Sequence, residues 1–105
     1  MWLLKDGGEN QVVVLAARYE CKPGTSEQVQ AALMEMKSLV QKESGCLLYL
    51  VNRSLENPDV FLLFEQYENE QALEAHAETD YFQRLVKETI LPLLAKRDRE
   101  LYRPL

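Results

Sequence analysis

Three stretches of the chain have the hydrophobic pattern of buried β-strands. They span residues 11–20 (QVVVLAARYE), 46–54 (CLLYLVNRS) and 60–67 (VFLLFEQY). Successive side chains of a strand point to opposite faces of a sheet, and in these stretches both faces are largely apolar. That pattern is typical of strands covered on both sides. The charged stretch of residues 96–104 (KRDRELYRP) is predicted to form a fourth strand at an edge.

The segments between these strands contain helix signals. Thr25 and Gln28 have the spacing of a capping box, and the apolar stripe that follows predicts a helix to about residue 43. Asn69 is expected to cap a short helix over residues 70–77. A third helix is predicted over residues 81–91 and is expected to end at the proline that follows.

The predicted order is therefore strand, helix, strand, strand, helix, helix, strand. This order is typical of an α+β protein with a ferredoxin-like split βαβ fold, in which helices cover one face of an antiparallel sheet. The 105 residues fit one domain, placed at residues 11–105 after a flexible leader of residues 1–10. Because three strands are apolar on both faces, a second copy is expected to cover the sheet face that the helices leave free, as a homodimer.

Charge and composition exclude several classes of protein. The net charge is −5 and the isoelectric point is about 4.9, whereas binding to nucleic acid or to an anionic membrane favours basic surfaces. No apolar run approaches the roughly 20 residues of a membrane span, and the four residues before Lys5 are too short for a signal peptide, so a cytoplasmic location is expected. Cys21, Cys46 and a single histidine are too few ligands for a zinc site. No sequence motif for a metal, nucleotide, flavin or haem cofactor is present, so none is predicted.

The candidates for catalysis are polar residues that interrupt apolar faces. His76 is the only histidine, and its ordinary pKa near 6.5 suits it to proton transfer near neutral pH. Tyr67 shares a strand face with Glu65, and Tyr81 begins the third helix beside Phe82, so both tyrosines could hold a phenolic oxygen of a substrate. Each residue has an ordinary alternative role: a hydrogen-bonded histidine, tyrosines that pack with a solvated hydroxyl, and a glutamate paired with an arginine.

Two residues of the other strands are further candidates for substrate binding. Asn52 continues the apolar face of the second strand, and Arg18 continues that of the first. Near the end of the chain, Arg97, Arg99 and Arg103 could bind an anionic substrate. Charges on a solvated edge strand explain these three arginines equally well.

Several segments follow one another in a recognisable order. They are residues 12–29 (VVVLAARYECKPGTSEQV), 45–49 (GCLLY), 56–58 (ENP), 61–67 (FLLFEQY), 72–76 (ALEAH) and 81–82 (YF). In this order they resemble the antibiotic biosynthesis monooxygenase family, which includes cofactor-independent quinol monooxygenases. The resemblance spans about residues 11–104.

The resemblance implies a dimeric α/β barrel with a pocket between sheet and helices in each subunit. It also implies that O₂ oxygenates a small aromatic polyphenol without a metal or organic cofactor, with His76 as proton shuttle and with Tyr67 and Asn52 orienting the substrate oxygen. Haem-degrading relatives have an asparagine in the first strand and a tryptophan late in the third. Residues 12–19 contain no asparagine, and Tyr67 stands in place of the tryptophan, so haem degradation is not expected.

Two other functions remain open on the same scaffold. An isomerase or lyase could use His76 as a base without O₂. A dimeric module that binds a small molecule would have no turnover at all. A shared fold does not decide among these functions.

Overall fold

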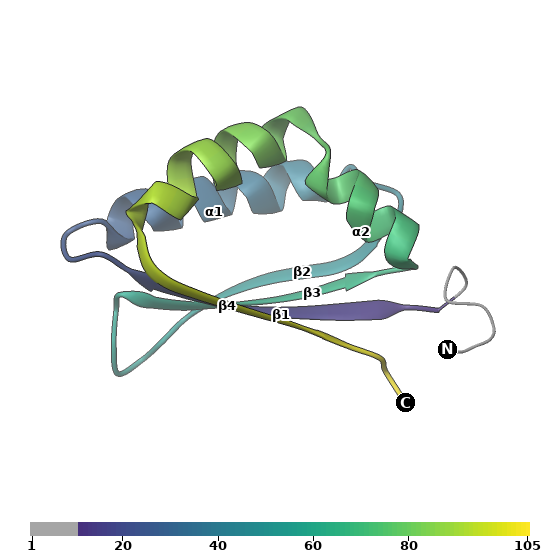
Figure 1. The fold of residues 1–105 in the computed structure, drawn as a ribbon, viewed down its shortest axis with the longest axis horizontal. Helices are drawn as coiled ribbons and strands as arrows, with labels where there is room; N and C mark the ends of the chain where they lie inside the picture. Colours follow the sequence, from purple (N-terminus) through teal and green to yellow (C-terminus); the bar gives the residue numbers. More distant parts are fainter. Residues whose placement is uncertain (1–10) are drawn as a thin grey trace.

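Four strands form one antiparallel sheet, and the helices lie together on one of its faces (Figure 1). The structure is a computed structural model that describes residues 11–105; the predicted leader, residues 1–10, lies outside them. In chain order the elements are β1 (Val13–Cys21), α1 (Ser26–Val40), β2 (Cys46–Arg53), β3 (Val60–Tyr67), α2 (Glu70–Ala77), the π-helix η2 (Phe82–Ile90), the short 3₁₀-helix η3 (Leu91–Leu93) and β4 (Leu94–Tyr102). The predicted element order and ferredoxin-like fold class are thus confirmed.

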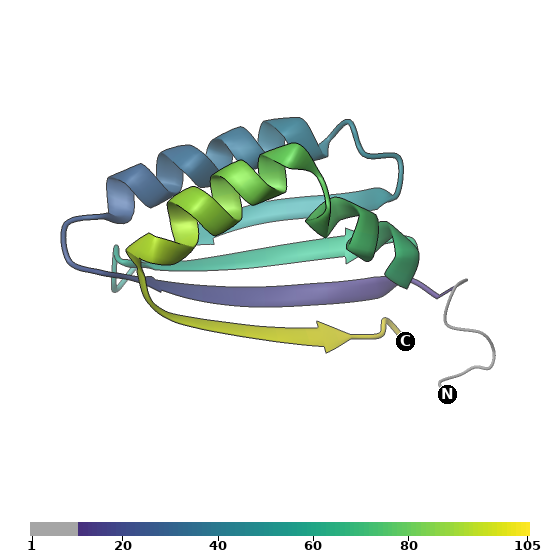
Figure 2. The same ribbon diagram turned by 45° about the horizontal axis from the view of Figure 1, so that its top comes forward.

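The strand order across the sheet is β2-β3-β1-β4, with every neighbouring pair antiparallel. The helices α1 and η2 run side by side over the sheet, and α2 covers the end of it where β3 finishes (Figure 2). The core lies between these two layers. Its largest fully buried side chains come from both layers and include Leu33 and Met36 of α1, Phe61 and Leu63 of β3, and Ile90 of η2. Burying one such side chain contributes about 1.5–3 kcal/mol.

The strand register places the side chains that face the helices in rows across the sheet. One row pairs Tyr49 of β2 with Glu65 of β3, and pairs Glu65 in turn with Leu15 of β1. In the next two rows, β1 pairs Ala17 with Arg99 and Tyr19 with Arg97 of β4. The β4 arginines therefore stand on the helix-covered face, two residues apart.

The start of α1 differs in detail from the predicted capping box. Thr25 is the N-cap residue, but its side chain makes no capping hydrogen bond. Its hydroxyl donates instead to the carbonyl oxygens of Lys22 and Leu93, at 2.8 and 3.1 Å, and so ties the β1–α1 turn to η3. The helix ends at Val40, about one turn earlier than predicted, and this leaves Glu43 in the loop before β2.

A close approach of α2 to that loop depends on Gly45. A Cβ atom added at Gly45 would lie only 2.5 Å from the Cβ of Ala72. The Glu68 amide donates to the Gly45 carbonyl at 2.9 Å, and the Asn69 side chain caps α2 as predicted by accepting from the Ala72 amide at 2.8 Å. These contacts fix α2 directly above the loop that contains Glu43.

The third helical segment is a π-helix rather than the predicted α-helix. Its end shows the wider spacing, because the Leu91 amide donates to the carbonyl of Val86, five residues earlier. Such segments are rare and occur frequently at functional sites. Pro92 lies in η3 immediately after it, and β4 begins at Leu94, two residues earlier than predicted.

Among the described residues, every helix lies on the one face, and none covers the opposite face of the sheet (Figure 1). Leu50 and Leu62 are 40% and 47% exposed there. The homodimer expected to cover this face stays a prediction. Among residues 11–105, no helix is both long and apolar enough to cross a membrane.

Candidate functional site

A cavity of about 150 Å³ lies between the sheet and the helices α2 and η2. All four strands and both of these helices contribute to its wall. The lining residues are Leu15, Ala17, Tyr19, Tyr49, Glu65, Leu73, Glu74, His76, Ala77, Phe82, Val86, Arg97 and Arg99. A larger hollow of about 440 Å³ lies beside Gly45, but it is lined by neither His76 nor Glu65. The smaller cavity, in contrast, brings His76 and Glu65 together with apolar side chains.

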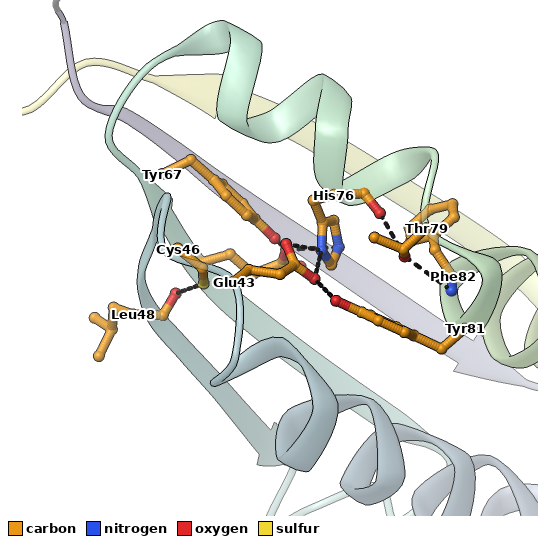
Figure 3. Close-up of polar contacts among 9 residues, drawn as sticks. Glu43, Cys46, Leu48, Tyr67, His76, Thr79, Tyr81 and Phe82 are labelled. Atoms are coloured by element: carbon orange, nitrogen blue, oxygen red, sulfur yellow. Dashed lines mark hydrogen bonds and ion pairs between the residues drawn. The ribbon is translucent and has the colours of Figure 1, made fainter.

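The imidazole of His76 is held by the carboxylate of Glu43. Its Nδ1 lies 3.1 Å from both oxygens of Glu43, and the hydroxyl of Tyr81 donates to Oε2 of the same carboxylate (Figure 3). A carboxylate accepts only, so Nδ1 carries the proton in this pair. The other ring nitrogen, Nε2, is then the free base.

Burial keeps this histidine neutral. His76 is 3% exposed, and desolvation lowers its pKa below the ordinary value of 6.5. The hydrogen bond and charge of Glu43 act in the opposite direction, but burial is the larger effect. At neutral pH Nε2 is therefore an unprotonated acceptor.

A second carboxyl group lies opposite His76. Glu65 is 3% exposed, and one of its oxygens lies 4.0 Å from Nε2 of His76. Burial raises the pKa of Glu65 to about 7, although the 2.5 Å hydrogen bond donated by Tyr67 and the positive charges of Arg99 and Arg97 oppose the shift. The Glu65 carboxyl thus changes its protonation state near neutral pH.

Aromatic rings surround the histidine. The Phe82 ring meets it edge-on, with centroids 5.2 Å apart and planes at 74°, and the rings of Tyr67 and Tyr49 lie 5.1 and 6.1 Å away. Burial raises the pKa of Tyr49 well above 10, so its hydroxyl stays protonated. The rings of Phe82 and Tyr49 also line the cavity, and such walls suit a flat aromatic ligand.

Residues 12–88 match the family model described as antibiotic biosynthesis monooxygenase. The chain belongs to this family.

Relatives and solved structures agree with that membership. An uncharacterised protein of Synechocystis is 30% identical over 89 residues, which cover 85% of this chain; the chain spans 60% of that relative's length. A Shewanella oneidensis structure matches with a TM-score of 0.85 and 25% identity, covering 90% of this chain and 92% of that one. A Bacteroides thetaiotaomicron protein named for the same family matches with a TM-score of 0.84 and 26% identity, over 94% of this chain and 93% of its own.

Five of the predicted site residues lie at the cavity or contact a residue that does or that holds His76. His76, Glu65 and Phe82 line it. Tyr67 lies behind Glu65 and reaches the cavity only through its hydrogen bond to that carboxyl group. Tyr81 likewise acts through Glu43 rather than on the cavity itself.

Asn52 and Arg18 lie elsewhere. Both point to the sheet face opposite the helices, because a strand alternates its side chains and these two are out of phase with Tyr49 and Tyr19. The Asn52 amide donates to the Leu62 carbonyl at 3.1 Å, and Arg18 pairs with Glu20 at 3.2 Å. The structure thus does not bring either residue to His76.

Glu43 is the residue that sequence reasoning missed. The first helix was predicted to run to about residue 43, whereas Glu43 lies in the loop after α1 and contacts both His76 and Tyr81. No spacing rule joins positions 43 and 76. Tyr49 also lines the cavity and is not among the predicted site residues, although its strand pairing with Glu65 could have indicated it.

Proposed function

We propose that this protein is a cofactor-independent monooxygenase that oxidises a quinol or related polyphenol with O₂. The observation that supports the proposal most is one cavity faced by both a neutral histidine and a buried carboxyl group. The family match and the family name of the Bacteroides protein support the same class of reaction.

The cavity suits a substrate of one aromatic ring. A cavity of about 150 Å³ in another protein core accommodates a single benzene ring. Here the rings of Phe82, Tyr19 and Tyr49 supply apolar walls, while Nε2 of His76 and the Glu65 carboxyl supply polar contacts for ring hydroxyls. We therefore propose a monocyclic hydroquinone in preference to a larger polycyclic one.

His76 is proposed as the base. Nε2 accepts the phenolic proton, and the imidazolium that forms is stabilised by Glu43 at Nδ1, which lies 3.1 Å away. Glu65, 4.0 Å from Nε2, adds a second carboxyl group that can share the proton. Tyr67 and Tyr81 serve as positioning residues, because each donates to one of these carboxylates.

The oxygen chemistry belongs to the deprotonated substrate. The phenolate transfers one electron to O₂, and the semiquinone and superoxide that result combine into a peroxide on a ring carbon. The O–O bond then breaks: one oxygen atom stays on the ring and the other leaves as water. Overall, hydroquinone and O₂ give hydroxybenzoquinone and water. The protein's part is to bind, deprotonate and exclude bulk water.

The test is product analysis under ¹⁸O₂ with chelator-treated protein and a panel of hydroquinones and catechols. We expect O₂ uptake above the autoxidation rate and one labelled oxygen atom in the product. Turnover under nitrogen would instead indicate an isomerase or lyase that uses the same base. Binding without turnover, aerobic or anaerobic, would indicate a binding module.

A further inference from the structure

Two arginines of β4 line the same cavity. Arg97 and Arg99 stand on the helix-covered face and reach the cavity beside Tyr19 and Ala17, with which they pair on β1. The Arg97 guanidinium carbon lies 6.0 Å from the centre of the Tyr19 ring. The cavity thus has guanidinium groups on its β4 side in addition to the acid–base pair around His76.

Within the described part of the chain, neither arginine forms an ion pair. Among residues 11–105, the ion pairs within 4.0 Å include neither guanidinium. The Nε atom of Arg97 is buried and has no hydrogen-bond acceptor. A buried N–H group without an acceptor is unfavourable, and proteins normally satisfy it with water or a ligand.

Two carboxyl groups also line the cavity, but they leave room for an anion. Glu74 belongs to α2 and is exposed, so solvent screens its charge. The Glu65 carboxyl group can donate a hydrogen bond when it is protonated and only accepts when it is ionised. One of its oxygens already accepts a hydrogen bond from the Tyr67 hydroxyl. The half-buried guanidinium of Arg97 and the exposed guanidinium of Arg99, which solvent also screens, therefore face one screened negative charge and one carboxyl group that is neutral below about pH 7.

From these contacts we infer that the cavity selects a single aromatic ring that bears a carboxylate, which Arg97 and Arg99 bind. The guanidinium group is planar, and its parallel N–H donors match the two oxygens of a carboxylate. The ring would lie against Phe82 and Tyr49 with its hydroxyl toward His76. This inference rests on the proposed use of the cavity as the substrate site, and it narrows the substrate to an acidic hydroquinone such as a dihydroxybenzoate.

The experiment measures equilibrium binding of benzoate and benzamide, two ligands of nearly equal shape that O₂ does not oxidise. It is run at pH 6, where benzoate is ionised and most of Glu65 is protonated. We expect benzoate to bind at least about tenfold more tightly than benzamide, since a charge-assisted pair adds more than one tenfold step in affinity.

Variants then assign this preference to the two arginines. Arg97→Gln and Arg99→Gln should each reduce the benzoate preference, and the double variant should remove it. Arg97→Lys should restore part of it. Arg84→Gln is the matched control, because Arg84 is exposed, pairs with Glu35 and lies outside the cavity lining. Thermal unfolding of each variant checks the fold, and Arg99→Gln carries the test if Arg97→Gln loses stability.

Three outcomes would overturn the inference: equal affinity for both ligands, no binding of either ligand, or a benzoate preference that survives in the double variant. Because no turnover is measured, a benzoate preference without O₂ consumption would leave this inference standing and refute the proposed oxygenase. Conversely, if the protein oxygenates neutral hydroquinone but does not prefer benzoate, the proposed oxygenase stands and this inference is refuted.

Discussion

The two faces of the sheet use polar residues in different ways. On the helix-covered face, Glu65 is buried and bonded to Tyr67, and its pKa is raised to about 7. On the open face, Arg18 forms a solvent-exposed ion pair with Glu20, and the Asn52 amide donates to the Leu62 carbonyl at another exposed position. Burial, more than residue type, separates a polar side chain with altered chemistry from an ordinary one.

The faces also differ in their apolar residues. Phe61 and Leu63 are fully buried under the helices, whereas their neighbour Leu62 is 47% exposed on the other face. One face of this strand is therefore fully buried in the core, whereas its other face exposes apolar side chains. Four experiments sharpen this comparison, from the largest expected effect to the smallest, and a fifth tests the proposed reaction directly.

The first concerns assembly. If a second copy covers the open face, the wild-type protein should sediment as a dimer, and Leu62→Arg should sediment as a monomer because it places an unpaired charge in the interface. Sedimentation equilibrium measures the mass directly. Met34→Arg, an exposed change on α1, is the matched control. A wild-type monomer at every concentration would show that the open face needs no second copy.

The second compares stability on the two sides of β3. Phe61→Ala should lower the free energy of unfolding by about 3–5 kcal/mol, because it empties a fully buried site. Leu62→Ala should lower it by less than about 1 kcal/mol in the monomer. Urea unfolding of both variants at low concentration measures the difference. Equal losses would mean that the two faces are packed alike.

The third uses the buried carboxyl group. The pKa of Glu65 is about 7 in the folded protein and about 4.5 without burial, so the folded state binds its proton more tightly. Its contribution to stability is full below pH 4.5 and is lost as the pH rises toward and past 7, a change of about 3 kcal/mol. Glu65→Gln should remove this loss and be more stable than wild type at pH 8. Urea unfolding at a series of pH values from about 4 to 9 measures the free energy of unfolding of both proteins. If the wild-type and variant free energies change with pH in the same way, Glu65 does not have a raised pKa.

The fourth concerns the loop residue that holds His76. Glu43→Gln keeps the size of the side chain but removes its charge, so the imidazolium formed during catalysis is less stable. We expect kcat to fall about tenfold with little change in KM. The acidic limb of the pH profile should shift toward lower pH, because the hydrogen bond and charge of Glu43 raise the pKa of His76 and their loss lowers it. A matched change at Glu35, which pairs with Arg84 on the surface, should leave both unchanged. If Glu43→Gln lowers Tm but leaves the pH profile of kcat unchanged, Glu43 contributes to stability and not to the reaction.

Much of this molecule follows from its sequence, and the reasons are local. The strand pattern of residues 60–67 and the cap at Asn69 determine β3 and α2, and His76 follows from the same stretch. Strand alternation could have excluded Asn52 and Arg18 once the helix-covered face was known, because Tyr49 and Tyr19 are out of phase with them.

The remaining features depend on tertiary contacts. Glu43 reaches His76 only because α1 ends at Val40 and Gly45 lets α2 approach the loop, and no local pattern records either fact. The π-helical spacing of η2 is also set by packing, since its apolar stripe fits an α-helix equally well. The pKa of Glu65 depends on how deeply the helices bury it.

The most direct test measures O₂ uptake with a hydroquinone by variants from the two faces of the sheet. His76→Ala removes the proposed base on the covered face, and Asn52→Ala removes a polar side chain on the open face. We expect uptake above autoxidation to fall about 10²–10⁴-fold in His76→Ala and to be unchanged in Asn52→Ala. Equal activity of His76→Ala and wild type, or a loss in Asn52→Ala as large as in His76→Ala, would contradict a reaction in this cavity.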